Sequence, residues 1–182
     1  MIKKIFFLTF IGIPIFCHSQ LSDSLKKMES ESKPDFANYE QLLFDATEYI
    51  FDNPVNFKSK EFVSACRIVD FWKNEDTGVN IPIFGNFYNS MNPKSNQRYF
   101  YMIAIVNYIL NEKLNNNHIL KNVKVEGQKY NEQEDVKESQ IEGARIFLDY
   151  VSDENNRLSL NSKSKKFLKA HKRGELNEMF FE

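Results

Sequence analysis

The stretch Tyr99–Leu110, with the sequence YFYMIAIVNYIL, contains a single strongly polar residue, Asn107. Asn92 followed by Pro93 forms a favourable cap and first helical position, so we expect a helix that lasts to about residue 114. A helix that is apolar on almost every side is surrounded by other helices. The sequence therefore predicts that residues 95–114 form the central helix of an all-α fold.

Apolar residues recur every three or four positions on both sides of this central helix, which is the helical period. The expected helices cover residues 34–53, 58–74, 131–152 and 162–174, and an apolar turn follows at 176–180. Residues 79–91 are predicted to form a buried loop with a helical turn. Val123 and Val125 alternate with polar residues within residues 118–130, so a short strand or hairpin is possible in this segment. The expected architecture is a compact bundle of helical hairpins with five or six helices.

An internal similarity suggests an alternative architecture. The segment Ile68-Val69-Asp70-Phe71 matches Ile105-Val106-Asn107-Tyr108 at an offset of about 37 residues. This period is typical of paired-helix solenoids, so a short TPR/HEAT-like αα solenoid is the alternative. The anchor residues of the familiar repeats are missing, which favours chance similarity between amphipathic helices of one composition.

The N-terminus has the pattern of a secretory signal peptide. Lys3 and Lys4 precede an apolar run over residues 5–16, and small residues follow it. We expect cleavage between Ser19 and Gln20. The mature chain then has 22 basic and 25 acidic residues, a formal charge of −3.

Two other fates of this segment stay open. An uncleaved membrane anchor needs about 20 apolar residues, more than the run over 5–16 supplies. Acylation at Cys17 would give a lipid anchor, but the bulky Phe16 before the cysteine disfavours it. After cleavage we expect a polar linker or a frayed helix over residues 20–33, a single all-helical domain over 34–182 and no transmembrane segment. The protein is then periplasmic or secreted.

The composition resembles that of a bacterial group. Lysine outnumbers arginine by 19 to 5, and asparagine, isoleucine and phenylalanine are abundant. Together with Gln20 after a small residue, this is similar to small secreted all-helical proteins of Bacteroidota, a group with no assigned activity. The resemblance covers mainly the signal peptide and the composition. It implies export and transfers no functional residue.

Charge and cysteine usage exclude several classes of protein. The whole chain has 24 basic and 25 acidic residues, whereas a nucleic-acid-binding domain is strongly basic. Cys66 is the only thiol left after cleavage, so no disulfide framework forms. It lies on the apolar stripe of its helix and is predicted to be a buried small hydrophobe.

No motif indicates a cofactor, and none has the ligand spacing of a metal site. The chain lacks a phosphate-binding glycine loop, a nucleophile elbow and paired Cys or His ligands. Glu48 is the only weak catalytic candidate, since Asp45 and Asp52 share its helix face and glycoside cleavage uses two carboxylates. A solvated acidic face is the simpler interpretation. Asn107 is expected to hydrogen-bond a neighbouring helix, because a buried amide needs partners.

The strongest charge feature is a basic run near the C-terminus. Six cations occur within eleven residues without an acid: Lys163, Lys165, Lys166, Lys169, Lys172 and Arg173. The candidate binding residues are Lys165, Lys166, Lys169 and Arg173. The run could face an acidic partner or anionic lipid headgroups, or it could complement the acidic segment 126–142.

These observations favour one function class over another. The absence of a catalytic set favours a periplasmic or extracellular binding protein, immunity-like or scaffold-like, whose partner is a protein or another envelope component. The alternative is a small envelope glycan hydrolase that uses carboxylates. A binding protein would expose an apolar or charged patch, whereas a hydrolase would need a groove with a desolvated acid.

Overall fold

The computed structural model describes residues 20–73 and 77–181 of the 182-residue chain. This part of the chain is helical and contains no strand, which confirms the predicted all-α class. The helices are α1 (Gln20–Ser30), α2 (Glu40–Asp52), α3 (Lys60–Lys73), α4 (Gly85–Ser90), α5 (Gln97–Asn115), α6 (Glu134–Ser152), α7 (Ser164–Arg173) and α8 (Leu176–Phe181), with 3₁₀ turns at Phe36–Tyr39, Tyr130–Glu132 and Glu154–Asn156. The predicted cleavage after Ser19 and the alternative at Cys17 fall outside the described residues.

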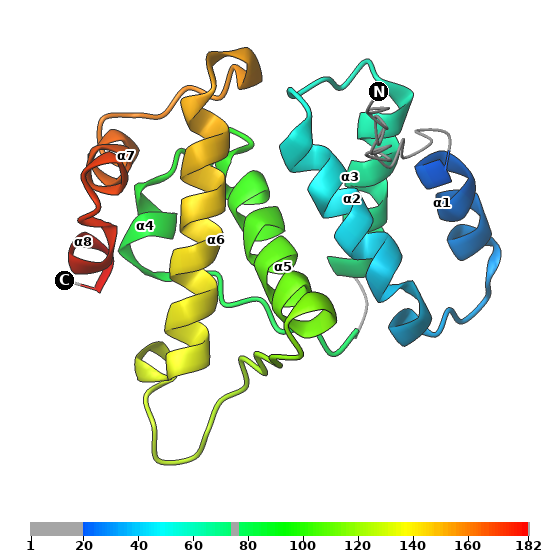
Figure 1. Cartoon of the computed structure of the whole chain (residues 1–182), viewed down its shortest axis with the longest axis horizontal. Coiled ribbons are helices and arrows are strands. Elements are labelled where there is room, and N and C mark those ends of the chain that lie inside the picture. The colour runs from blue at the N-terminus through cyan, green and yellow to red at the C-terminus, as the bar shows by residue number, and fades with distance from the viewer. Residues whose placement is uncertain (1–19, 74–76, 182) are drawn as a thin grey trace, which may run out of the picture.

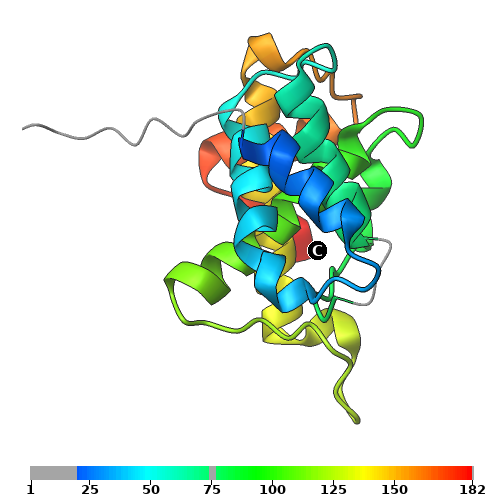
Figure 2. The same ribbon diagram turned by 90° about the vertical axis from the view of Figure 1, so that its right-hand side faces the viewer.

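The helices form two antiparallel hairpins with smaller helices at each end. Figure 1 shows α2 beside α3 and α5 beside α6, and α2 also contacts α5, which joins the two hairpins. Viewed from the side, α1 lies across the α2–α3 hairpin (Figure 2) and contacts both helices. Helices α7 and α8 cover the far side of α6, and α4 contacts α7. The predicted compact bundle of hairpins is confirmed.

Eight α-helices form in the described residues, and the prediction of five or six was too low. The additional helices are short. Helix α4 has six residues and lies where we expected a buried loop with a helical turn, and α8 has six residues in the predicted apolar turn. The third, α1, replaces the predicted linker.

Helix α1 replaces the polar linker predicted over residues 20–33 and agrees with the helical alternative, although it is docked on the core. Leu25 is 3% exposed and Met28 is fully buried, and both belong to the main hydrophobic core. With Leu21 they form a narrow stripe at spacings of four and three residues. Arg67 of α3 pairs with Glu29 at 2.6 Å. Serines and charged residues around the stripe give the segment the composition of a linker. The stripe is nevertheless sufficient to pack the helix against α2 and α3.

Helix α5 is central, as its apolar sequence predicted. It lies between α2 and α6, and 11 of its 19 residues are buried. Ile103 and Leu110 have no exposed surface, and Val106 is 3% exposed. It joins the two hairpins, because it pairs with α6 in its own hairpin and buries its other side against α2.

Helices α5 and α6 approach closely at Gly143. A Cβ atom at this position would lie 2.6 Å from the Cγ1 atom of Ile105 and 2.9 Å from its Cα atom. Real Cβ atoms do not come so close to backbone, so only glycine fits at this crossing. The backbones of the two helices therefore pack without a side chain between them here.

The segment between α5 and α6 is an irregular loop, and the strand or hairpin that remained open for residues 118–130 does not form there. Gln133 takes the place of a partner strand. Its amide nitrogen donates to the carbonyl of Val123 at 2.7 Å, and its oxygen accepts from the backbone N–H of Val125 at 3.0 Å. Buried Asn122 bonds to Ser139 and Asp135 of α6. These bonds hold the loop against the start of α6.

Within residues 20–73 and 77–181, no helix is both long enough and apolar enough to cross a lipid bilayer.

Candidate functional site

The basic run of the sequence lies on α7, with its apolar residues turned into the core. Phe167 and Ala170 are buried, and the Phe167 ring lies 5.0 Å from that of Phe87 and 6.3 Å from that of Phe180. The cations project to solvent, because helical periodicity separates them from the buried stripe. We call the exposed cations the basic face of α7: Lys163, Lys165, Lys166, Lys169, Lys172 and Arg173.

Most charges of this face have no acidic partner in the described part of the chain. Arg173 is the exception, since it pairs with Glu175 at 2.7 Å. The five lysines form no ion pair with any described residue. Acids of segment 126–142 pair locally instead, Glu132 with Lys129 at 2.8 Å and Glu142 with Arg145 at 3.1 Å. No ion pair among the described residues joins the basic face to that acidic segment.

Glu48 and Asn107, which the sequence singled out separately, are in direct contact. The side-chain nitrogen of Asn107 donates to a Glu48 carboxylate oxygen at 2.7 Å and to the hydroxyl of Thr47 at 3.1 Å. Asn107 is 6% exposed and Thr47 is fully buried, so the expected hydrogen bonding to a neighbouring helix is confirmed. Glu48 is exposed at the rim of this contact, which ties α5 to α2.

Cys66 has the environment of a structural thiol. It is 8% exposed, and burial raises its pKa to about 11. Since the thiolate is the reactive form of cysteine, a raised pKa makes the group inert. The prediction of a buried small hydrophobe is confirmed.

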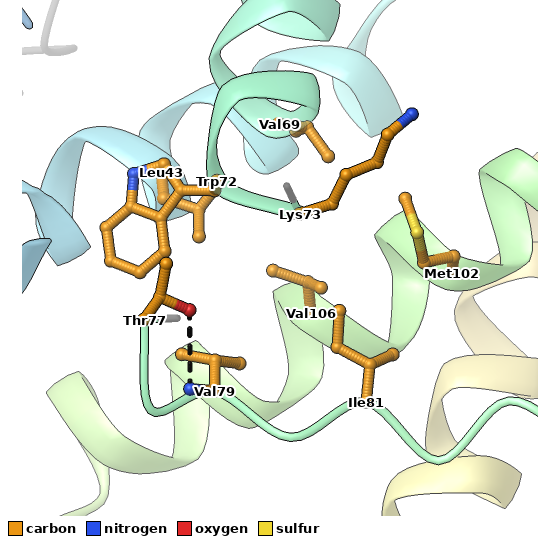
Figure 3. Close-up of a pocket in the computed structure, with 9 residues that line it drawn as sticks. All are labelled: Leu43, Val69, Trp72, Lys73, Thr77, Val79, Ile81, Met102 and Val106. Atoms are coloured by element: carbon orange, nitrogen blue, oxygen red, sulfur yellow. Dashed lines mark hydrogen bonds between the residues drawn. The ribbon is translucent and has the colours of Figure 1, made fainter. Parts of the chain in front are cut away.

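An apolar pocket lies between α2, α3, α5 and the segment after residue 77 (Figure 3). Its cavity is about 60 Å³, room for about two water molecules, whereas pockets for small ligands measure about 300–1,000 Å³. Its lining is apolar apart from Lys73 and Thr77, and the Thr77 hydroxyl accepts from the Val79 N–H. The pocket is therefore a packing gap of the core and too small for a small-molecule ligand.

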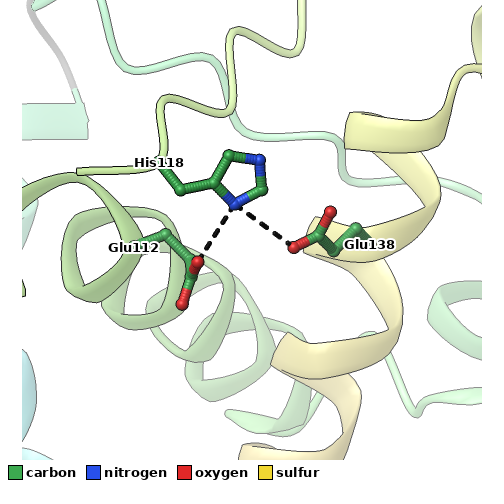
Figure 4. A group of neighbouring side chains, drawn as sticks. All are labelled: Glu112, His118 and Glu138. Carbon is green, nitrogen blue, oxygen red and sulfur yellow. Dashed lines mark hydrogen bonds and ion pairs between the residues drawn. The ribbon is translucent and has the colours of Figure 1, made fainter. Parts of the chain in front are cut away.

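A second cluster of polar side chains joins three segments that are separate in the sequence. The Nδ1 atom of His118 lies 3.0 Å from an oxygen of Glu112 and 3.7 Å from an oxygen of Glu138. Figure 4 shows the imidazole between the two carboxylates, with Glu112 on α5, His118 in the following loop and Glu138 on α6. The donor atoms all lie within 4.8 Å of one another.

The backbone places His118 in this position. Asn117 has a φ of 54°, in the left-handed region that asparagine adopts more readily than most residues. The chain reverses there, and the His118 backbone N–H donates to the carbonyl of Glu112 at 2.9 Å. The sequence alone does not reveal this cluster, because its members follow no ligand spacing and meet only when α6 packs on α5. The run of asparagines before the histidine is the one local signal of the turn.

No protein-family model, curated protein or solved structure matches the chain. The side chains that the fold brings together are therefore the basis on which a function can be inferred.

Proposed function

We propose that the protein is an exported binding protein and that the basic face of α7 docks on an acidic surface of a partner protein. The observation that carries the proposal is the set of five exposed lysines with no acidic partner in the described residues. The formal charge of the whole chain is only −1. The positive charge is therefore concentrated on α7 and does not reflect a basic protein. Complementary charge of this kind speeds encounter and selects partners.

The packing of α7 favours a protein partner over a lipid surface. A helix that binds a bilayer interface inserts its apolar side between the headgroups. In α7 that side is already occupied, because Phe167 packs against Phe87 and Phe180 in the core. The exposed lysines are therefore the groups with which α7 can contact a partner, and they are complementary to an acidic protein surface. Immunity-like and scaffold-like roles both fit this mode of binding.

Export is part of the same proposal. Its support is the order of charged, apolar and small residues before Gln20. Cleavage there would leave every described residue of α1 in the mature protein. N-terminal sequencing of the protein from the envelope or the medium should begin within a residue or two of Gln20. Recovery of the intact N-terminus in the cytosol would contradict export.

A site-specific cross-linking experiment tests the binding surface. A photoreactive amino acid replaces Lys166 on α7, or Lys124 in the loop before α6 as a control, in cells that produce the protein. Both positions are exposed. We expect a cross-link to one acidic protein from position 166 and none to that protein from position 124. Equal cross-linking from both positions, or cross-linking only to lipid, would contradict the proposal.

A further inference from the structure

We propose that Glu112, His118 and Glu138 bind one divalent transition-metal ion of the zinc type. The three side chains come from the end of α5, the following loop and the first half of α6, and they converge on one point (Figure 4). The site is independent of the basic face of α7, since it shares no residue with it.

The two distances from the His118 imidazole to the carboxylates are close to those around a small tetrahedral ion. Zinc bonds to imidazole nitrogen and carboxylate oxygen are about 2.0–2.2 Å long, which places neighbouring ligands of a tetrahedral site about 3.3–3.6 Å apart. The Nδ1 atom of His118 lies 3.0 Å from Glu112 and 3.7 Å from Glu138. Both separations lie close to the expected range, so small side-chain movements suffice for coordination.

Outer hydrogen bonds already orient both carboxylates. The Tyr108 hydroxyl donates at 2.7 Å to Oε1 of Glu138, the oxygen that also faces the imidazole; a carboxylate oxygen has two lone pairs and can bind a metal ion as well. The Asn116 side chain donates at 2.6 Å to the Glu112 oxygen that does not face the imidazole. Metal ligands are commonly held in this way by a second layer of donors, which lowers the cost of assembling the site.

The charges around the cluster favour an added cation. No described lysine or arginine pairs with Glu112 or Glu138, so His118 is their only potentially cationic partner in the described chain. The pKa of Tyr108 is raised, first by burial and then by the hydrogen bond to Glu138 and the neighbouring carboxylates. A bound dication would offset the repulsion between the two carboxylates.

The ligand set selects the class of metal. One imidazole and two carboxylates suit zinc and its neighbours, whereas calcium and magnesium prefer sites made of oxygen alone. The His118 side chain is 50% exposed and that of Glu138 is 35% exposed, which leaves an open position for water. An ion here would tie the loop that carries exposed Ile119, Val123 and Val125 to both central helices.

Calorimetric titration with zinc chloride, on mature protein stripped of metal with a chelator, tests the site. We expect one zinc ion per chain and a higher melting temperature with zinc than without. His118→Gln and Glu138→Gln should each weaken zinc binding at least tenfold. His171→Gln is the matched control, because His171 lies on α7 and pairs with Asp149 at 2.6 Å. It should bind zinc as the wild type does.

The outcomes separate a metal site from a simple ion pair. If His118 serves only as an imidazolium between two carboxylates, no saturable zinc binding will be seen in the wild type. Equal weakening by His118→Gln and His171→Gln would indicate non-specific binding to histidine. Either result overturns the proposal. Circular dichroism of each variant confirms that the fold is retained, which is expected because His118 is half exposed.

Discussion

Single residues show how burial decides reactivity and hydrogen bonding in this protein. Cys66 is the only thiol in the described residues and has an ordinary pKa of 9.0, which burial raises to about 11. At neutral pH this rise of about two units in the pKa reduces the fraction of Cys66 present as thiolate about 100-fold. Limited access through the surrounding core reduces the reaction further.

The first prediction concerns this thiol. Alkylation of Cys66 with iodoacetamide at pH 7 should be at least 100-fold slower in the folded protein than in protein unfolded with urea. From pH 7 to 9 the rate in the folded protein should rise about tenfold per pH unit without a plateau, because the pKa lies above this range. Mass spectrometry of timed samples gives both rates. Rapid labelling at pH 7 would show that the thiol is exposed or activated.

The second prediction concerns the contact between Asn107 and Glu48. Glu48→Gln keeps an oxygen that accepts the Asn107 N–H, so the free energy of unfolding should change by less than about 0.5 kcal/mol. Asn107→Asp removes the donor and sets two carboxylates against each other, which should cost about 1–3 kcal/mol. Glu48→Gln should restore part of that loss in the double variant, since glutamine can donate to Asp.

Glu48→Gln also separates the two function classes. A binding protein should be unaffected by this substitution. A glycan hydrolase that uses Glu48 would lose cleavage of peptidoglycan or polysaccharide while keeping its fold. Strong hydrolysis by the wild type, abolished by Glu48→Gln, would therefore favour the enzyme over the binding protein proposed above.

At the scale of elements, helix packing sets the stability. Helix α1 is short, and isolated helices of this length are marginal in water. Its contacts with α2 and α3 through Leu25 and Met28 must therefore hold it in place. A true linker would contribute no such contact.

The third prediction tests the docking of α1. Met28→Ala should lower the free energy of unfolding by about 2–5 kcal/mol, because it leaves a cavity in the core. Lys27→Ala, at the exposed neighbouring position, should change it by less than about 0.5 kcal/mol. Urea denaturation of the mature protein measures both. Equal, small effects would show that α1 does not belong to the cooperative unit.

The fourth prediction tests the close approach of α5 and α6. Gly143→Ala should destabilise the protein by about 1–3 kcal/mol despite the higher helix propensity of alanine, because the new Cβ meets the backbone of Ile105. Ser152→Ala, at an exposed position of the same helix, is the control. A Gly143→Ala variant more stable than the wild type would mean that the two helices are farther apart.

These elements also show what a sequence can reveal. The central helix was predictable because twelve consecutive positions carry one strongly polar residue, a signal that needs no tertiary information. Helix α1 was only an alternative to a linker, because its apolar stripe is narrow and its docking depends on contact with α3. The loop before α6 resembled a strand because Val123 and Val125 alternate, but a distant side chain, Gln133, satisfies their backbone groups.

The same distinction applies to the sites. The basic face of α7 was predictable as a run of cations in a single helix, and the structure adds that these cations have few internal partners. The Glu112–His118–Glu138 cluster was not predictable. Its residues come from three segments and meet only through the packing of α6 on α5 and the turn at Asn117. Local patterns reveal surfaces on one helix, whereas sites between helices require the fold.

For the whole molecule, the fold is a rigid support for charge at one end of the bundle. The α5–α6 hairpin forms the centre, α1 lies at one end, and α7 lies at the other (Figure 1). The lysines of α7 are exposed there. Because the apolar side of α7 packs in the core, the backbone that carries the basic face is held in place. Binding therefore costs little backbone entropy, although the exposed lysine side chains still lose rotamer freedom.

The most direct test of this account is the dissociation constant for the acidic protein that cross-links to α7. It is measured for the wild type, for Lys165→Glu/Lys166→Glu/Lys169→Glu, and for the control Lys58→Glu/Lys94→Glu/Lys124→Glu, whose three exposed lysines lie elsewhere. Both variants change the net charge equally. We predict at least tenfold weaker binding for the α7 variant alone, and weaker wild-type binding at high salt. Equal affinities of the two triple variants would contradict the proposal.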